Sequence, residues 1–452
     1  MAFAKDFVWG AATSAYQIEG AVNTGGKGRH IWDIYTDEPG HVFEGHTGET
    51  ACDHYHRFRE DVKLMKEIGL KGYRFSVDWS RVLPDGFGCV NEEGIAFYNS
   101  LIDELLEYDI EPYITLYHWE LPYEIYKRGG WMNPQIVEWF GEYARLAAER
   151  FSDRVTHFFT LNEPQCFVGL GFLTGEHAPG LKSPLCDTFA MAHNVLKAHG
   201  RAVQKLRQYG KQEITIGYAP TCGMCYPETD KPEDIKAARQ ALFAMNQDDR
   251  NWTWNVSWWS DPVLLGHYPE EGLRRYEKYL PKITEEDMKL IAEPIDVYGQ
   301  NIYNGRCVRM GTDGKPEDVR RCEGFPKTAI DWPVTPEALY WGPKFLYERY
   351  QKPIYITENG LSCHDVLSID GKVHDPNRID FLARYLHELK RAAGEIDLRG
   401  YFQWSLMDNF EWAKGYSERF GLIYVDFKTQ ERILKDSAYW YRNIIQNNGE
   451  KL

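Results

Sequence analysis

The chain has 452 residues, of which 43% are hydrophobic and 26% charged, a composition typical of globular proteins that bury a core without disulfides or metals. Its formal net charge of −15 argues against nucleic acid as a partner, because affinity for a phosphate backbone depends on clustered lysine and arginine. No apolar run approaches the roughly twenty residues needed to span a bilayer, so we expect no membrane partner.

The nine cysteines follow no repeating spacing, and residues 1–20 lack the basic and apolar segments of a signal peptide. We therefore expect reduced thiols and a cytoplasmic location. Cys222 and Cys225 form a lone C-x-x-C pair without a matching second pair of metal ligands. His54 and His56 lie two apart on a helical stretch, which places them on different faces. The sequence thus predicts no metal and no cofactor.

Short β-rich runs alternate with longer helical patterns along the chain. The runs are rich in Tyr, Phe, Ile, Val and Thr, which suit a buried pleated surface. In chain order they cover residues 7–13, 72–79, 111–119, 157–164, 213–220, 296–303, 353–360 and 398–406. Apolar residues recur at helical spacing between them, as in 51–70, 94–110 and 378–394.

This alternation predicts the α/β class and a single (β/α)8 barrel, of the TIM-barrel type, with elaborated βα loops. A doubly wound open sheet is the alternative, but no glycine-rich phosphate fingerprint follows the first run. Because the chain shows no linker and no change of composition, we expect residues 1–452 to form one domain.

Polar side chains gather where the predicted strands end. They are Asp78, Trp79, His118, Trp119, Asn162, Glu163, Asn301, Tyr303, Glu358 and Asn359. In a (β/α)8 barrel the C-terminal ends of the strands form the active-site face, so we expect these side chains to meet at one mouth of the barrel.

Two glutamates stand in similar contexts at two of these ends, Glu163 in TLNEP and Glu358 in ITENG. Carboxyl groups from different strands can converge across a barrel mouth, and glycoside hydrolysis needs two that flank the scissile bond. Burial and the like charge of the partner would raise the pKa of the one that serves as acid. Spacing alone leaves open whether the two are catalytic or are ordinary ion-paired strand-end residues.

Several segments resemble glycoside hydrolase family 1, the β-glucosidase family. TLNEP and ITENG match its two signature motifs, and the other matching segments follow in the family's order. They are FVWGAATSAYQIEG, YRFSVDWSRVLP, YITLYHWELP, GEHAPG and FQWSLMDNFEWAKGYSERFGLIYVD. The resemblance covers essentially the whole chain and implies a single catalytic domain over residues 1–452.

By this resemblance Glu163 is the acid/base and Glu358 the nucleophile of a retaining enzyme. Such enzymes have carboxyl groups about 5 Å apart and form a covalent glycosyl-enzyme intermediate. Arg74 and Tyr303 match residues that contact the nucleophile, and the Arg would keep Glu358 ionised. Asn162 matches the residue that holds the sugar 2-hydroxyl.

The resemblance also implies a pocket for the sugar that is cleaved, the glycone. It comprises Gln17, His118, Trp119, Asn162, Asn301, Trp404, Glu411, Trp412 and Phe420. Among them Trp404 matches the aromatic residue that underlies the sugar ring. The implied partner is a small β-glucoside or oligosaccharide, and the sequence leaves a homo-oligomer open.

Departures from the family pattern gather on the side of the leaving group, the aglycone. Gln165 stands where many relatives have Trp, Thr221 stands where bacterial relatives often have Asn, and Trp332 resembles an aglycone-gate Trp. Residues 248–262 are unusually rich in Trp, and Cys166 and Cys222 are expected near this entrance or in ordinary packing. These departures leave cello-oligosaccharides and aryl or alkyl β-glucosides open as substrates, and β-galactosides and β-fucosides as well.

Particular residues disfavour three alternatives within the family: a thioglucosidase, a 6-phospho-β-glucosidase and a catalytically silent relative. Plant thioglucosidases replace the acid/base with Gln, whereas this chain has Glu163. The 6-phospho-β-glucosidases lack the glutamate that corresponds to Glu411, whose charge would repel a 6-phosphate. A catalytically silent sugar-binding relative would have lost a catalytic glutamate, and this chain retains both.

Overall fold

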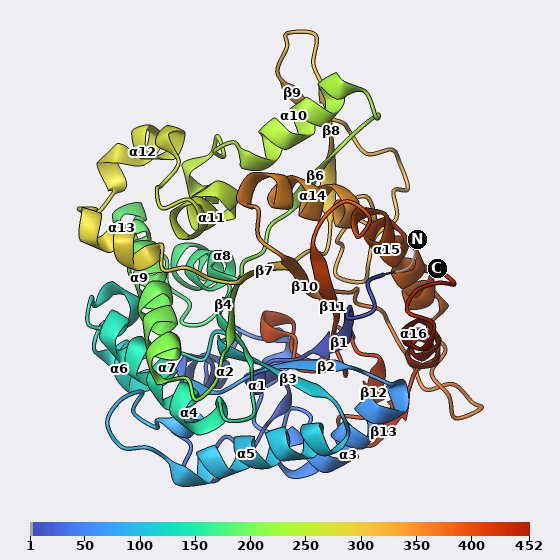
Figure 1. Ribbon diagram of the computed structural model, residues 1–452. Helices are drawn as coiled ribbons and strands as arrows, with labels where there is room; N and C mark the ends of the chain where they lie inside the picture. Colours follow the sequence, from blue (N-terminus) through green and yellow to red (C-terminus); the bar gives the residue numbers. More distant parts are fainter. Residues whose placement is uncertain (1–2) are drawn as a thin grey trace.

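The computed structural model describes residues 3–452, in which eight parallel strands close into a barrel (Figure 1). The strands are β1 (Val8–Ala12), β2 (Gly72–Ser76), β3 (Glu111–Tyr117), β4 (His157–Asn162), β5 (Thr215–Ala219), β7 (Val297–Asn301), β10 (Ile354–Asn359) and β11 (Leu398–Trp404). Each lies within one of the eight predicted runs, and they follow one another around the barrel in chain order. The (β/α)8 prediction is confirmed.

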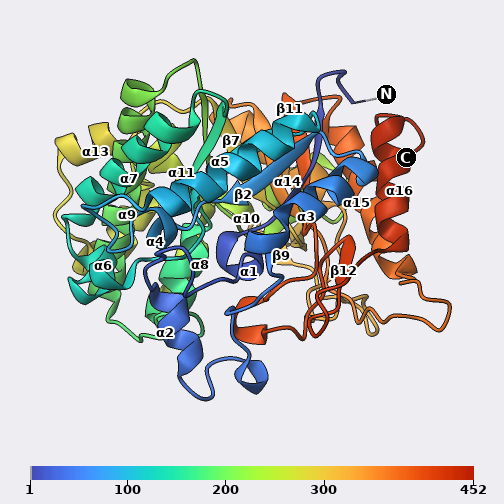
Figure 2. The same cartoon turned by 90° about the horizontal axis from the view of Figure 1, so that it is seen from below.

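Helices surround the barrel. The longer ones are α3 (His54–Ile68), α5 (Glu92–Glu107), α7 (Ile136–Phe151), α9 (Leu185–Tyr209), α14 (Ala338–Tyr350), α15 (Pro376–Ala392) and α16 (Asp436–Gln446). The helices predicted in 51–70, 94–110 and 378–394 correspond to α3, α5 and α15. Figure 2 shows α3 and α5 side by side on the outside of the barrel.

The remaining elements occupy the connections. The helices are α1 (Ala15–Ile18), α2 (Ile31–Asp37), α4 (Trp79–Val82), α6 (Tyr123–Lys127), α8 (Pro164–Val168), α10 (Pro232–Phe243), α11 (Val256–Leu264), α12 (Glu270–Tyr276) and α13 (Glu285–Ile291). Among them α10 is as long as the shorter of the surrounding helices. Two small sheets lie outside the barrel. One consists of β6 (Met224–Pro227), β8 (Gly305–Met310) and β9 (Pro316–Asp318), and the other pairs β12 (Ile423–Val425) with β13 (Arg432–Leu434). The first projects beyond the barrel beside α10 (Figure 1). Within residues 3–452, no helix has both the length and the apolar character needed to cross a bilayer.

The barrel interior is filled by aromatic rings that face glycines on neighbouring strands. A Cβ atom at Gly10 would lie 2.5 Å from the ring of Phe402, and one at Gly217 would lie 2.4 Å from the ring of Phe159. Both distances are too short for any side chain other than hydrogen. The large–small pairing therefore fills the centre of the barrel with side chains.

Candidate active site

A cavity of about 680 Å³ opens at the C-terminal ends of the strands. It brings together ten of the residues singled out in the sequence. They are His118, Trp119, Glu163, Thr221, Tyr303, Trp332, Glu358, Trp404, Glu411 and Trp412. The convergence predicted for strand ends is therefore present, although the residues come from segments spread over nearly the whole chain.

Glu358 is buried near the end of β10, and both of its carboxylate oxygens are held by charged or polar donors. Arg74, on β2, donates from its guanidinium to Oε1 at 2.7 Å. The phenol of Tyr303 donates to Oε2 at 2.8 Å. Charge-assisted bonds of this kind stabilise the ionised form of a carboxyl group.

Amide side chains extend this network toward the second glutamate. Arg74 uses its other terminal nitrogen to donate to Oδ1 of Asn162 at 2.7 Å, and Asn301 donates to the same oxygen at 3.0 Å. The amide nitrogen of Asn301 also donates to Oε1 of Glu163 at 2.7 Å. A continuous chain of hydrogen bonds therefore joins the two carboxyl groups across the ends of β2, β4, β7 and β10.

Glu163 immediately follows β4 and precedes the short helix α8. Its backbone has φ of 45°, a left-handed conformation that is uncommon for residues other than glycine and that is found at functional sites. In addition to Asn301, the thiol of Cys166 contacts its carboxyl group at 3.1 Å. No lysine or arginine forms an ion pair with Glu163 in residues 3–452, so its hydrogen-bonding partners are neutral.

The two carboxyl groups differ in what stabilises their charge. Burial, followed by the charge of Glu358, raises the pKa of Glu163 to about 8. Burial also raises the pKa of Glu358, but Arg74 and Tyr303 oppose that rise directly. Because two adjacent carboxylates disfavour double ionisation, the pair holds a proton at neutral pH, and the environment places it on Glu163.

Glu411 lines the inner end of the cavity. Gln17 lies behind it and contacts its carboxyl group. The amide of Gln17 donates to Oε2 of Glu411 at 3.5 Å and to the carbonyl oxygen of Phe410 at 2.9 Å. Burial and the nearby charges of Glu358, Glu418 and Glu163 raise the pKa of Glu411 to about 8. At neutral pH this carboxyl group can therefore both donate and accept hydrogen bonds.

Aromatic rings and one neutral histidine complete this end. His118 stacks on Trp404 with ring centroids 5.7 Å apart, and Trp119 packs against Trp412 at 4.5 Å. Burial and the charge of Arg74 hold the pKa of His118 well below its usual range. One ring nitrogen of His118 contacts the amide of Asn162 at 3.1 Å, while Nδ1 has no hydrogen-bonding partner in residues 3–452. Nδ1 is thus a buried polar atom without a protein partner among these residues.

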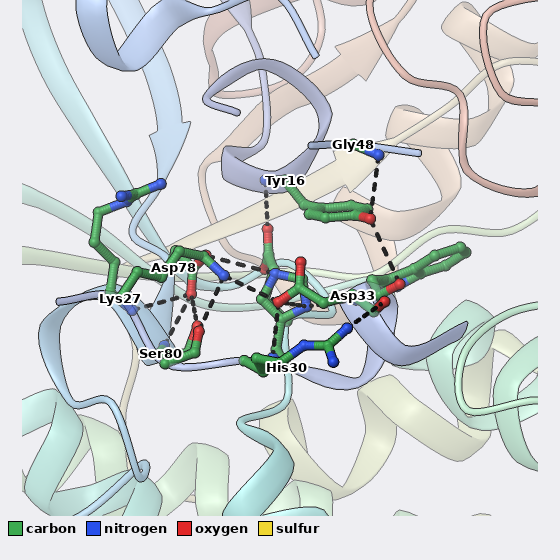
Figure 3. A network of polar contacts seen from close by, with 12 residues as sticks. Tyr16, Lys27, His30, Asp33, Gly48, Asp78 and Ser80 are labelled. Carbon is green, nitrogen blue, oxygen red and sulfur yellow. Dashed lines mark hydrogen bonds and ion pairs between the residues drawn. The ribbon is translucent and has the colours of Figure 1, made fainter. Parts of the chain in front are cut away.

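A buried network of charged and polar side chains lies behind the inner end of the cavity, next to α1 (Figure 3). The ammonium of Lys27 lies 3.1 Å from Asp33 and 3.5 Å from Asp78. Tyr16, next to Gln17 in sequence, contacts the hydroxyl of Thr36 at 3.1 Å. Tyr16 therefore joins α1, which carries Gln17, to α2, and Lys27 joins α2 to Asp78 after the end of β2.

A loop segment, residues 326–334, contributes Ile330 and Trp332 to the outer side of the cavity. Its tip carries Trp332, which contacts Tyr303 edge-on with centroids 5.1 Å apart. Phe420 is buried next to both rings and is not among the cavity-lining residues. The hydroxyl of Ser362 accepts a hydrogen bond from the backbone N–H of Ile330 at 2.9 Å, which anchors the tip to the loop after β10.

Asp78, Trp79 and Asn359 were expected at the mouth but do not line the cavity. Six of the predicted catalytic and binding residues do not line it either. They are Gln17, Arg74, Asn162, Gln165, Asn301 and Phe420. Arg74, Asn162 and Asn301 act through the hydrogen-bonding network. Gln165 is buried, and its Oε1 accepts a hydrogen bond from the backbone N–H of Thr221 at 3.3 Å, so it supports the outer wall from behind.

The sequence did not identify several residues that do line the cavity. They include Tyr35, His41, His177, Trp254 and Lys414. Two signals were available in the sequence, since His177 lies in the GEHAPG segment and Trp254 in the Trp-rich stretch 248–262. The contact of Cys166 with Glu163 was also missed, although a separation of three residues at the start of a helix brings side chains together.

The arrangement suits a reaction that needs a proton donor and a nucleophile on opposite sides of one bond. Glu163 can supply the proton, since its pKa lies near 8, and Glu358 can attack as a carboxylate. The aromatic rings and polar groups at the inner end can hold a ring with several hydroxyl groups.

Comparisons with known proteins agree with this geometry. A family model described as glycosyl hydrolase family 1 matches residues 1–450. β-Glucosidase A of Thermotoga maritima is 46% identical over 450 residues, covering 99% of this chain and 98% of the relative. A 1,4-β-D-glucan glucohydrolase of Thermotoga neapolitana is also 46% identical, covering 99% of each chain. A structure of β-glucosidase from Thermotoga maritima in complex with glucoimidazole superposes with a TM-score of 0.90 at 45% identity, covering 99% of both chains.

Proposed function

This chain belongs to glycosyl hydrolase family 1, and we propose that it is a retaining β-glucosidase that hydrolyses terminal, non-reducing β-D-glucosyl residues. Cello-oligosaccharides and aryl or alkyl β-glucosides are the proposed substrates, with β-galactosides and β-fucosides as further candidates. The observation that carries the proposal is the unequal environment of the two carboxyl groups. Arg74 and Tyr303 stabilise a carboxylate on Glu358, whereas the groups that hydrogen-bond to Glu163 within residues 3–452 are neutral.

In the first step the carboxylate of Glu358 attacks the anomeric carbon while Glu163 donates its proton to the departing oxygen. The carbon–oxygen bond to the aglycone breaks as the bond to Glu358 forms. In the second step Glu163, now ionised, takes a proton from water, and that water displaces Glu358 from the anomeric carbon. Two inversions restore the β configuration, and all proton transfers use side chains, so the reaction requires no metal or cofactor.

Glucose recognition is proposed for the inner end of the cavity. Trp404 would underlie the ring, and the imidazole of His118 would bind a hydroxyl. Glu411 would read hydroxyls farther from the scissile bond, and Gln17 would hold Glu411 in place from behind. Asn162 lies behind the cavity wall, so a contact with the 2-hydroxyl would need its side chain to turn toward the sugar. A site that bonds specific hydroxyls rejects analogues that lack them, because its polar groups would be left unpaired.

A 6-phospho-β-glucosidase activity is not favoured. Glu411 would place a carboxyl group in the pocket of the glycone. Because the pKa of Glu411 is about 8, this carboxyl group is fully ionised only above that pH. Its repulsion of a 6-phosphate is therefore strongest at alkaline pH. Glucosides should therefore be preferred over their 6-phosphates, and more strongly at pH 9 than at pH 6.

We further propose that residues 1–452 act as one catalytic domain in a reducing compartment such as the cytoplasm. All nine cysteines are free thiols in the structure, including the pair Cys222 and Cys225, which agrees with such a compartment.

The stereochemistry of the product tests the proposed function. Hydrolysis of an aryl β-glucoside, followed by proton NMR, should release β-glucose before it mutarotates. Glu358→Ala should abolish hydrolysis, and added azide should rescue it and yield the α-glucosyl azide. Glu163→Ala should spare substrates with good leaving groups far more than those with poor ones. Release of α-glucose would exclude retention, and no turnover between pH 5 and 8 would favour a silent sugar-binding protein.

A further inference from the structure

We propose that Cys166 is a positioning residue for the acid/base: its thiol holds oxygen Oε2 of Glu163 and reverses its hydrogen bond as that carboxyl group loses and regains its proton. This inference rests on the proposed function, because it concerns the residue assigned as the acid. It assigns the proton of Glu163 to one particular oxygen, Oε2.

The local backbone explains how the thiol reaches the carboxyl group. Cys166 lies in the first turn of α8, and its backbone N–H donates to the carbonyl oxygen of Glu163 at 2.9 Å. This turn places Sγ at 3.1 Å from Oε2. Both residues line the cavity and both are at least nine-tenths buried, so little water competes for the contact.

The oxygen that carries the proton follows from a chain of obligatory donors. A guanidinium can only donate, so the atom of Asn162 that faces Arg74 is its oxygen, Oδ1. The atom of Asn301 that faces this oxygen must then be the NH2 group. The second hydrogen of that NH2 group points at Oε1 of Glu163 at 2.7 Å. A proton on Oε1 would face this hydrogen, whereas the one hydrogen-bonding partner of Oε2 among residues 3–452 is the thiol.

A thiol can serve both protonation states of its neighbour. Its sulfur can accept a weak hydrogen bond from a protonated Oε2, and its S–H can donate to an ionised Oε2 after rotation about Cβ–Sγ. An amide NH2 group cannot reverse in this way. Burial and the charge of Glu163 hold the pKa of the Cys166 thiol well above its usual range, so the sulfur keeps its proton throughout the cycle.

The proton balance of the cycle is therefore simple. Glu163 gives the Oε2 proton to the departing oxygen, and the S–H of Cys166 turns toward the new carboxylate. When water attacks the glycosyl-enzyme, Oε2 takes its proton and the S–H turns away. Cys166 neither gains nor loses a proton, and its role is to orient the carboxyl group in both steps.

Two variants separate positioning from packing. Cys166→Ser keeps a rotatable group that can donate and accept, while Cys166→Ala removes it. Cys225→Ala, which removes a buried thiol outside the cavity, is the control. For methyl β-glucoside, whose leaving group is poor, we expect Cys166→Ala to lower kcat by about 3- to 10-fold. The alkaline limb of its pH profile should move upward, because the ionised carboxyl group loses a donor. Cys166→Ser and the control should stay within about 2-fold of the unmodified protein.

Infrared spectroscopy provides a readout that does not depend on turnover. The S–H stretching band that disappears in Cys166→Ala should move to lower frequency as pH rises through about 8, because the thiol begins to donate to the ionised Glu163. The band should stop responding to pH in Glu163→Gln. A band that is insensitive to pH, or equal pH profiles and kcat values for Cys166→Ala and Cys225→Ala, would overturn the proposal. If the protein lacked β-glucosidase activity, this titration would still decide whether the thiol follows the carboxyl group.

Discussion

The guanidinium of Arg74 lies 2.7 Å from the carboxylate of Glu358, although the two residues are 284 positions apart in the chain. Arg74 is on β2 and Glu358 on β10, and the closed barrel makes both strand ends part of one mouth. Tyr303 from the loop after β7 completes the contact. This relationship gives one glutamate a permanent counter-charge and leaves the other with neutral donors.

Replacement of Arg74 should therefore disable the nucleophile. Arg74→Met leaves Glu358 buried without a counter-charge, so the pKa of Glu358 should rise further and kcat/KM should fall by about 100-fold or more. Arg74→Lys restores the charge but cannot donate to both Glu358 and Asn162, so most of the loss should remain. Steady-state kinetics on an aryl β-glucoside measures both losses, and an Arg74→Lys variant with full activity would contradict the role of the two-pronged contact.

The pH dependence of kcat/KM should report the two carboxyl groups. Activity should fall as pH rises through about 8, because Glu163 then loses the proton that it must donate. It should also fall on the acid side as Glu358 becomes protonated, at a pH above the ordinary range of a glutamate because burial raises its pKa. With a substrate whose leaving group needs no proton, Glu163→Ala should lose the alkaline limb. An alkaline limb that persists in that variant would belong to another group.

Ser362 should control the aglycone side without touching the sugar. Ser362→Ala removes the hydroxyl that accepts from Ile330, so the loop segment that carries Trp332 should be held less firmly. The backbone bond from Ala329 to the carbonyl oxygen of Ser362 remains, so the segment is loosened but not released. We expect the ratio of kcat/KM for aryl β-glucosides to that for cellobiose to change by about 3-fold. Inhibition by glucose should stay unchanged. Ser100→Ala, on the exposed face of α5, is the control, and equal effects of both variants on the ratio would contradict this assignment.

Lys27 should stabilise the fold from inside the network of Figure 3. Although burial acts to raise it, Lys27 and neighbouring cations hold the pKa of Asp78 at about 2, so this carboxyl group stays ionised. Lys27→Met would leave Asp33 and Asp78 without their buried cation, and we expect a loss of about 3–5 kcal/mol in the free energy of unfolding. Lys66→Met removes an exposed pair instead and should cost less than about 1 kcal/mol. Denaturant unfolding measures the midpoints of the two variants. Equal midpoints would show that the buried ion pairs of Lys27 contribute no more to stability than the exposed pair of Lys66.

Local patterns in the sequence predicted the strands, the helices and the positions of the two glutamates at strand ends. Eight apolar runs of strand composition alternate with helical patterns, and each run contains one barrel strand. These signals are local, because a side chain's burial on a strand or a helix face depends on residues a few positions away. Polar residues at the ends of such runs also marked the mouth of the barrel, since a parallel barrel brings every C-terminal strand end to one face.

The partners that surround each glutamate depend on contacts that form when the barrel closes. Hydrogen bonds across the mouth join residues more than one hundred positions apart, such as Asn301 with Glu163, and no local pattern encodes them. The structure turned Gln165 away from the cavity and placed Cys166 against Glu163. The two glutamates predicted from the sequence therefore acquire different protonation only through burial and distant neighbours, because a pKa depends on which charges and donors folding brings within a few ångströms.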